Sequence, residues 1–313
     1  MLRLIVRRVL LMGLTALTVS ALLFFSVTKL LGSPAGMMLG QDASPQAIAA
    51  LNAQYGFDRP ALSQYLHWLG DALTGDLGRS YTTQQSVAQA IATRVPVTLE
   101  LAVWSIALAV AAAVFFNTIP VARAPVRRIV TLVNLVGISV PNFMLGVSLI
   151  FLLSVQLDLL PSTGWVPWSD GVGAHLAHMV MPVLTLSAYY FGAFSIVYRA
   201  EYQDVIQRPF IGVARARGLS EWRVAFRHAA PNAILPVITF VGISIGQLTG
   251  GAVVTETIFS MPGTGRLFVA SIEGRDFPVM LAIGMLIVVG VVLMNLLADI
   301  AYTIANPQIR HAS

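Results

Sequence analysis

The chain has 313 residues and a formal net charge of +5, with 57% apolar and only 11% charged residues. Soluble proteins carry about 25% charged residues, so this composition excludes an ordinary soluble domain and indicates an integral membrane protein. The absence of cysteine excludes disulfides and thiolate chemistry, and the basic residues are spread over short segments, which is typical of membrane orientation rather than of nucleic-acid binding.

The first apolar segment, Val9–Thr28, follows a start that carries Arg3, Arg7 and Arg8. A cleaved signal peptide is the competing interpretation, but its apolar region spans only about 7–15 residues. Because a membrane-spanning helix needs about 20 residues, the sequence predicts a retained first span.

Six segments have the length and composition of membrane spans, and they predict an all-α, polytopic membrane protein with six transmembrane helices. They are Val9–Thr28, Leu101–Ile119, Ile129–Gln156, Met179–Tyr198, Ala233–Thr255 and Val279–Leu297. The third is long and holds Pro141 near its middle, so we expect a tilted or kinked helix there.

The arginines predict the orientation. Cytoplasmic segments of membrane proteins carry an excess of Lys and Arg, and most acidic residues of this chain fall on the opposite side. Both termini are therefore predicted to be cytoplasmic. The arginines placed inside are Arg3, Arg7, Arg8, Arg123, Arg127, Arg128, Arg199, Arg208, Arg215, Arg217, Arg223, Arg227 and Arg310.

Residues 31–98, between the first two spans, are too long for a plain connector and predict a small helical cap on the outer face. Turn formers open it, namely Gly32, Ser33, Pro34 and Gly36. Ser44 as N-cap, Pro45 at the first helical position and Gly56 as the end predict one helix. Two more are predicted from apolar spacing, with faces Leu62, Leu66, Leu69 and Leu73, then Val87, Ile91 and Val95. The cap either packs on the spans or forms a docking or gating surface, and both can hold.

Two further outer segments are rich in turn formers. Asp158–Ala177 holds Trp165 and Trp168, which suit the outer headgroup zone. Glu256–Pro278 predicts an outer re-entrant or gating loop.

Catalytic and metal-binding patterns are absent from the sequence. The histidines are scattered, and for His175 and His178, three residues apart, interfacial solvation is favoured over metal binding. The only lysine, Lys29, lies outside any Gly-Lys-Ser/Thr loop, so we expect no ATP hydrolysis by this chain. Glu100 and Asp299 are the only acids near the spans, which disfavours a proton relay.

The spans are rich in small and weakly polar residues. They allow close helix packing, and they are equally suited to line a wide, uncharged path for a polar solute. The candidate path residues are Ser139 and Asn142 in the third span, and Ser244, Gln247 and Gly251, which are spaced along one helical face of the fifth.

The inner segment Pro209–Pro236 is charged and cannot lie in lipid. Pro209 begins a helix, Gly218 ends it with a left-handed turn, and Ser220 caps a second helix that Pro231 ends. The predicted apolar faces are Phe210, Val213 and Ala214, then Trp222, Ala225, Phe226 and Ala229. The arginines suit anionic lipid, whereas the small residues at the bend suit a partner's groove, and spacing alone leaves the two interpretations balanced.

The run from Ala214 to Val224, with Arg227-His228, Asn232-Ala233 and Leu235-Pro236, resembles the cytoplasmic coupling motif of ABC importer permeases of the dipeptide, oligopeptide and nickel branch. The resemblance extends along most of the chain. Its other motifs include Gly75-Asp76-Leu77-Gly78-Arg79-Ser80, Ser139-Val140-Pro141-Asn142-Phe143, Pro262-Gly263 with Gly265-Arg266, Asp276-Phe277-Pro278 and Asn306-Pro307-Gln308.

The resemblance implies one permease subunit of a bacterial inner-membrane importer for short peptides. It implies a second homologous permease, two ATP-binding subunits that hold ATP and Mg, and an external solute-binding protein. Implied divisions are 1–30 for the first span, 31–98 for the cap, 99–306 for the core with a coupling loop at 199–231, and 307–313 for the tail.

The implied coupling contacts are Ala214, Arg215, Ala216, Arg217, Gly218, Leu219, Ser220 and Glu221. The candidate external gate or binding-protein contacts are Asp76, Arg79, Arg266 and Asp276. Nickel chelates, glutathione or another small solute are alternative cargoes, and a non-transport scaffold or intramembrane enzyme is the alternative of another class.

Overall fold

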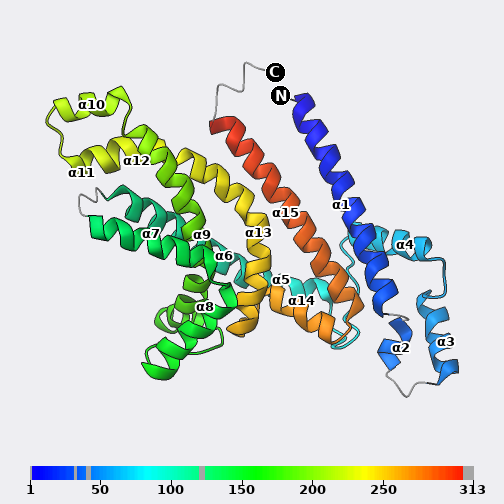
Figure 1. Ribbon diagram of the computed structural model, residues 1–313. Coiled ribbons are helices and arrows are strands. Elements are labelled where there is room, and N and C mark those ends of the chain that lie inside the picture. The colour runs from blue at the N-terminus through cyan, green and yellow to red at the C-terminus, as the bar shows by residue number, and fades with distance from the viewer. Residues whose placement is uncertain (1, 32–33, 40–43, 120–123, 306–313) are drawn as a thin grey trace. The chain divides into compact units, whose positions relative to one another are not determined.

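The computed structural model describes residues 2–31, 34–39, 44–119 and 124–305, and these ranges fold almost entirely into helices (Figure 1). No strand forms within them, and an isolated bridge pairs Arg79 with Ser86. The predicted all-α class is therefore confirmed. Two compact units form, Met1–Val97 with Gly263–Leu293, and Thr98–Pro262 with Met294–Ser313.

The helices follow in chain order. They are α1 (Leu2–Leu31), α2 (Pro34–Leu39), α3 (Pro45–Tyr55), α4 (Ala61–Leu73), α5 (Val87–Ala92), α6 (Val95–Thr118), α7 (Ala124–Ser139), α8 (Asn142–Leu149), the π-helix η1 (Ile150–Gln156), the 3-10 helix η2 (Trp168–Asp170), α9 (Val172–Val205), α10 (Pro209–Ala216), α11 (Glu221–Arg223), the π-helix η3 (Val224–Ala229), α12 (Ala230–Ala233), α13 (Leu235–Ile258), α14 (Thr264–Glu273) and α15 (Phe277–Ala305).

Within the described ranges, five helical segments are long and apolar enough to cross a membrane. They are Leu10–Lys29, Val87–Thr118, Val172–Val205, Leu235–Ile258 and Phe277–Leu296. Each overlaps one of the predicted spans, so the polytopic architecture is confirmed.

The sixth predicted span is broken. Arg128–Ser139 and Asn142–Gln156 meet at an angle of 111°. Pro141 causes the break, because proline has no N–H to donate and disfavours a helical conformation in the residue before it. Pro141 instead has φ −58° and ψ 138° and stands as the N-cap of α8. The kink predicted at Pro141 is thus a division into two helices.

In the first unit, α1, α4 and α15 share an aromatic core. Phe24 packs its ring edge-on against Tyr65 and Phe277, with ring centroids 5.6 and 5.8 Å apart. The Tyr65 hydroxyl also lies 2.8 Å from the Ser20 hydroxyl, which satisfies both groups away from water.

The core-facing side of α4 differs from the predicted one. Tyr65 is buried and Trp68 packs beside it, whereas Leu62, Leu66 and Leu73 are exposed. The leucine spacing correctly predicted a helix. It could not show which face is covered, because large aromatic rings bury more apolar area than leucine does.

The predicted ends of the helix that begins at Pro45 are confirmed. Ser44 accepts a hydrogen bond from the Ala47 N–H at 3.2 Å, and Gly56 ends α3 with φ +70°. Pro34 and Gly36, expected in a turn, lie in α2. Gly32, Ser33, Arg123 and the tail 307–313 lie outside the described residues.

The segment Glu256–Pro278 is not a plain loop. Glu256 lies in the last turn of α13, and the ten-residue helix α14 follows a turn around Pro262. Val87 and Ile91 of α5 bury against Val279 and Ile283 of α15, in a cluster that Leu267 and Phe268 of α14 adjoin. Several glycines and Pro262 made this stretch look irregular, although the residues between them complete a helix.

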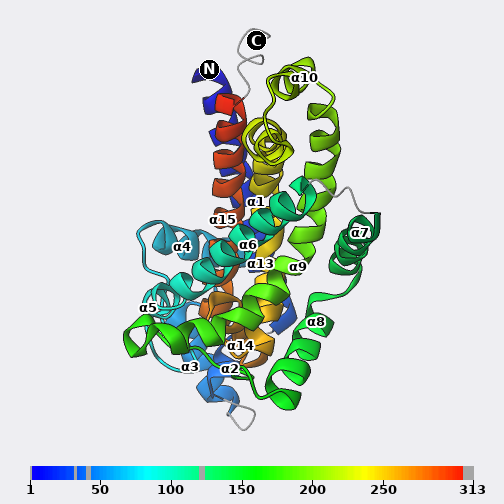
Figure 2. The ribbon, with the colours of Figure 1, turned by 90° about the vertical axis from the view of Figure 1, so that its left-hand side faces the viewer.

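In the second unit, α9 packs against α7, α8 and α13 (Figure 2). A Cβ on Gly137 of α7 would lie 2.5 Å from the Ala188 carbonyl oxygen, and one on Gly192 of α9 would lie 2.6 Å from the Asn134 carbonyl oxygen. Both distances are too short for a real contact, so glycine is required on each helix. Close packing therefore accounts for these small residues, as the packing interpretation predicted.

Candidate functional site: the charged helical pair between α9 and α13

The first helix of the pair begins and ends where the sequence predicts. Arg208 is extended, Pro209 occupies the first position of α10, and Gly218 has φ +75°. The Gly218 N–H donates to the Arg215 carbonyl at 2.9 Å, and the Leu219 N–H donates to the Ala214 carbonyl at 3.4 Å. These two bonds form a Schellman motif, which satisfies carbonyls that a helix end leaves free.

The second helix starts at its predicted cap but does not end at proline. Ser220 Oγ accepts a hydrogen bond from the Arg223 N–H at 3.4 Å. The chain then continues through η3 into α12, and Pro231 lies in the first turn of α12. The Ala230 N–H bonds the Ala225 carbonyl, five residues back. This wider turn accommodates the missing N–H and the ring of Pro231. The helix therefore continues with a locally wider hydrogen-bond pattern instead of ending.

Arg215 and Glu221 pair across the bend. Arg215 Nε and Nη2 lie 3.0 and 3.1 Å from the two carboxylate oxygens of Glu221. These hydrogen bonds raise the pKa of the Arg215 guanidinium above its ordinary value. Both side chains are about half exposed, so the pair adds little stability, about 0–1 kcal/mol. Its main effect is to join α10 to α11 by a second link besides the backbone.

Two sets of apolar residues divide the element into an inner and an outer face. Ile211 and Ala214 of α10 are buried, as are Val224, Ala225 and Ala229 of η3. Phe210, Val213 and Trp222 are exposed. Each predicted apolar face is therefore split. The inner residues are buried within the permease's own structure, whereas the outer residues project into solvent.

Trp222 is the largest exposed side chain of the outer face. Its side chain is 56% exposed and its ring centroid lies 4.3 Å from that of Phe226. Arg217, Arg223 and Arg227 are also exposed. Exposed aromatic rings and arginines are the residues that protein interfaces favour.

Replacing Gly218 by alanine should loosen this element. A Cβ there meets no atom within 4 Å, so the penalty comes from the left-handed backbone alone, about 1–2 kcal/mol. Hydrogen exchange of residues 209–229 should accelerate by about tenfold. Gly212→Ala is the matched control, because it lies inside α10 with equal space and should slow exchange or leave it unchanged. Equal exchange in both variants would contradict a role for the bend.

The comparisons with known proteins identify the chain. Residues 105–311 match the family model described as "Binding-protein-dependent transport system inner membrane component". Residues 1–102 match its N-terminal counterpart, "Binding-prot-dependent transport system membrane comp, N-term". The chain belongs to this family. It is therefore a multi-pass inner-membrane permease, a non-catalytic component of an ABC transport system that works with an ATPase and a solute-binding protein.

Curated relatives extend over nearly the whole permease. The glutathione transport system permease protein of Escherichia coli is 37% identical over 99% of this chain and 100% of its own length. A probable peptide ABC transporter permease protein of Sinorhizobium fredii is 35% identical over 90% of each chain. A putative peptide transport system permease protein of Brucella abortus is 37% identical over 96% of each.

One solved structure supports the fold. A chain from the "Crystal structure of an amino acid ABC transporter with histidines" matches with a TM-score of 0.51 and 16% identity, over 68% of this permease and 93% of that chain. At this identity the match indicates the fold alone.

The candidate path residues are only partly brought together. A Cβ on Gly251 would lie 3.3 Å from Asn142 Nδ2, so α13 and α8 meet at these two positions. Ser244 is buried and donates to the Phe240 carbonyl of its own helix at 2.8 Å, whereas Gln247 and Ser139 are exposed. Of the three candidate positions on α13, Ser244 is therefore buried, Gly251 partly buried and Gln247 exposed.

The candidate gate residues divide into structural and exposed groups. Asp276 is buried, where its carboxylate accepts from the Ser80 hydroxyl and, at 3.0 Å, from the Tyr81 N–H. It ties the 76–84 turn to the start of α15. Asp76, Arg79 and Arg266 are exposed.

Sequence reasoning missed a buried polar cluster in the second unit. His175 is fully buried, with Nε2 3.0 Å from Glu100 Oε1 and Nδ1 2.6 Å from the Val166 carbonyl. Trp168 stacks on its ring at 3.9 Å and donates its indole N–H to the same Glu100 oxygen at 2.8 Å. The expectation that His175 is solvated at the interface is wrong. Within the described residues, no group of three His, Cys, Asp or Glu is placed to hold a metal.

The hydrogen-bond pattern requires a proton between His175 and Glu100. The carbonyl of Val166 can only accept, so Nδ1 donates to it. Nε2 then faces a carboxyl oxygen, and a proton lies between them whether the pair is imidazolium and carboxylate or imidazole and carboxylic acid. The pair as a whole is neutral in both cases, which suits burial at the ends of two spans.

Glu256 is a second carboxyl that the sequence placed outside the spans. It is fully buried near the end of α13, where Thr98 donates to its Oε1 at 2.6 Å. A hydrogen-bonded carboxyl at this depth ties the start of α6 to α13.

Proposed function

We propose that this permease forms half of the translocation pathway of an ATP-driven importer for short peptides. A second homologous permease supplies the other half, two ATP-binding subunits attach on the cytoplasmic side, and an external solute-binding protein delivers the cargo. ATP and Mg belong to the ATP-binding subunits. Both termini are cytoplasmic in this arrangement.

The observation that carries the proposal is the split between the inner and outer faces of the charged helical pair. Ile211, Ala214 and Val224 anchor the element within its own unit, and the Arg215–Glu221 pair stiffens its bend. Trp222 and Val213 remain exposed on an element rich in arginine. Such an element can enter a groove of an ATP-binding subunit and transmit its movement to α9 and α13.

Residues 214–221 do not all have the same role in this proposal, although the motif alone suggested that all of them contact the partner. Ala214 packs inward, and Arg215 with Glu221 holds the bend, so these three act on the shape of the element. Ala216, Arg217 and Ser220 are exposed and remain available to the partner. In this proposal the coupling loop is 199–231 within the core 99–306, and 31–98 forms the external cap.

Short peptides are the proposed cargo because the relatives named for peptides and for glutathione, itself a tripeptide, are about equally similar to this chain. Nickel chelates or another small solute are the alternative cargoes. The family assignment removes an intramembrane enzyme from consideration.

Co-purification tests the assembly. The tagged permease, expressed with its neighbouring transporter genes, should retain a second permease and two ATP-binding subunits in detergent. Liposomes containing this complex should hydrolyse ATP faster when the binding protein and a di- or tripeptide are added. A complex that lacks ATP-binding subunits, or hydrolysis that no peptide stimulates, would contradict the proposal.

A further inference from the structure

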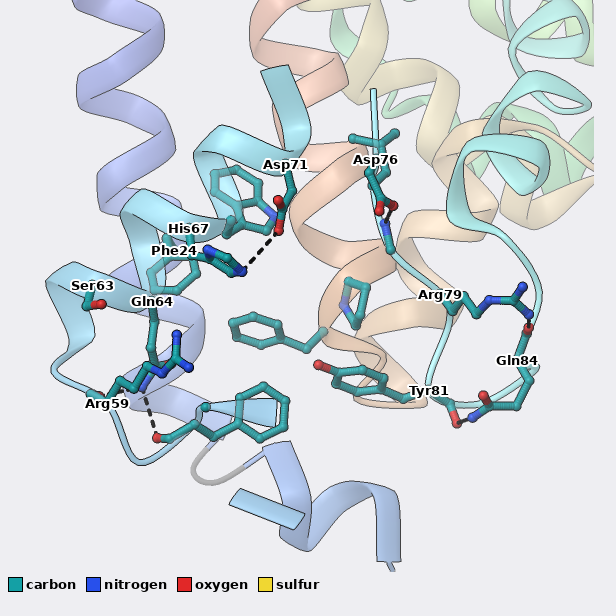
Figure 3. Close-up of a pocket in the computed structure, with 17 residues that line it drawn as sticks. Phe24, Arg59, Ser63, Gln64, His67, Asp71, Asp76, Arg79, Tyr81 and Gln84 are labelled. Carbon is teal, nitrogen blue, oxygen red and sulfur yellow. Dashed lines mark hydrogen bonds and ion pairs between the residues drawn. The ribbon is translucent and has the colours of Figure 1, made fainter. Parts of the chain in front are cut away.

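The first unit contains a cavity of about 380 Å³ (Figure 3), and no residue of the charged helical pair lines it. Its wall combines the end of α3 and its following turn, one side of α4, the 76–84 turn and the start of α15. Small-molecule sites in proteins occupy about 300–1,000 Å³, so the cavity is large enough for a ligand of a few residues.

The floor and walls are aromatic. Phe24 and Phe277 are buried beneath the cavity, and Phe57, Trp68 and Tyr81 are partly exposed around it. Phe57 and Tyr81 contact edge to face with centroids 6.3 Å apart. Aromatic faces of this kind receive an apolar side chain or a flat ring.

The rim carries two charges of each sign. Arg59 and Arg79 lie on opposite sides of the opening, and Asp71 and Asp76 lie along a third side (Figure 3). In the described part of the chain, no carboxylate pairs with either guanidinium, and Arg79 bonds only the Gln84 carbonyl, at 3.4 Å. The two guanidinium groups balance the two carboxylates, and His67 Nε2 lies 3.8 Å from Asp71 Oδ2.

The rim is also held in place before any ligand arrives. The Gln64 amide donates to the carbonyls of Phe57 and Arg59 at 2.9 and 2.8 Å, which fixes the turn that carries Arg59. Asp76 Oδ1 accepts from the Gly78 N–H at 2.9 Å and fixes the turn that carries Arg79. Preorganised groups lose less entropy when they bind a ligand.

We propose that this pocket binds a zwitterionic ligand with an apolar side chain, namely an amino acid or a short peptide with free termini. The ligand's ammonium group pairs with Asp71 or Asp76, its carboxylate pairs with Arg59 or Arg79, and its side chain packs against the rings. A simple anion or cation would meet charges of its own sign on the same rim. The pocket's external location rests on the proposed function, but its chemistry does not.

Peptide binding to the full-length permease in lipid nanodiscs tests this assignment. Isothermal titration should show saturable binding of Ala-Phe with free termini. Acetylating its amine or amidating its carboxylate should each weaken binding about 5- to 10-fold, as the loss of one partly exposed charged hydrogen bond does.

Charge-neutralising variants locate the site. Arg59→Gln combined with Arg79→Gln should weaken the free peptide by about the same factor, yet leave the amidated peptide unchanged. Asp71→Asn should likewise weaken binding of the free peptide, yet leave binding of the acetylated peptide unchanged. Arg275→Gln and Asp58→Asn are controls, because both residues are exposed and neither lines the pocket.

Three outcomes would overturn the pocket assignment. They are no saturable binding by folded wild-type protein, equal affinity for the free and capped peptides, or an equal loss in the control variants. Failure of the importer proposal is separate, because it is measured by peptide-stimulated ATP hydrolysis of the assembled complex, whereas the nanodisc titration contains no ATP-binding subunit.

Discussion

Replacing Trp222 by alanine is expected to abolish peptide-stimulated ATP hydrolysis while leaving the permease folded and inserted. Trp222 is 56% exposed in this chain, so its removal costs the isolated subunit little. If the ring is buried in an ATP-binding subunit, it should act as a hot spot worth about 2–4 kcal/mol, equivalent to about 30- to 1,000-fold in affinity.

The measurement is retention of ATP-binding subunits by the tagged permease, followed by ATP hydrolysis in liposomes. Trp104→Ala is the matched control, because Trp104 is 47% exposed but lies on the apolar helix α6. The coupling assignment fails if both variants retain their ATP-binding subunits and hydrolyse ATP like the wild type.

Replacing His175 by alanine is expected to destabilise the second unit by about 3 kcal/mol. The change removes a fully buried ring, leaves Glu100 without its proton-sharing partner and takes the stacking contact from Trp168. Breaking a buried charged pair by removing one partner costs about 3–5 kcal/mol, and the partial exposure of Glu100 places the expected value at the lower end.

Thermal unfolding of the permease in detergent measures this effect, and His178→Ala is the control. His178 lies three residues away and, among the described residues, bonds only the Ala174 carbonyl of its own helix, at 2.8 Å. We expect the His175 variant to unfold several degrees below the His178 variant. Coincident unfolding curves would show that the buried cluster contributes no stability.

The features that the sequence predicted correctly depend on neighbouring residues. Composition located the spans, and Ser44, Pro209, Gly218 and Ser220 marked helix ends because caps act within one turn. Which face of α4 is covered depends on distant residues such as Phe24 and Phe277, so leucine spacing could not decide it.

Pairings over long sequence distances were not predictable. Glu100 and His175 are 75 residues apart, and Ser80 and Asp276 are 196 apart. Nothing in either local stretch indicates its partner. Likewise, Arg215 and Glu221 appeared as two independent partner contacts, because only the left-handed turn at Gly218 brings their side chains together.

The π-helical segment η3 also fixes the angular relation between the outer face of the coupling element and α13. Each residue of an α-helix turns the chain by about 100°, and the wider turn at Val224–Ala229 holds one residue more than a regular helix would. Because the wider turn takes up this extra residue, deleting one residue there would restore regular winding and leave the direction of Trp222 relative to α13 nearly unchanged. The deletion would instead act at Pro231, whose ring and missing N–H the wider turn accommodates, so relatives that lack the extra residue should also lack a proline at this position.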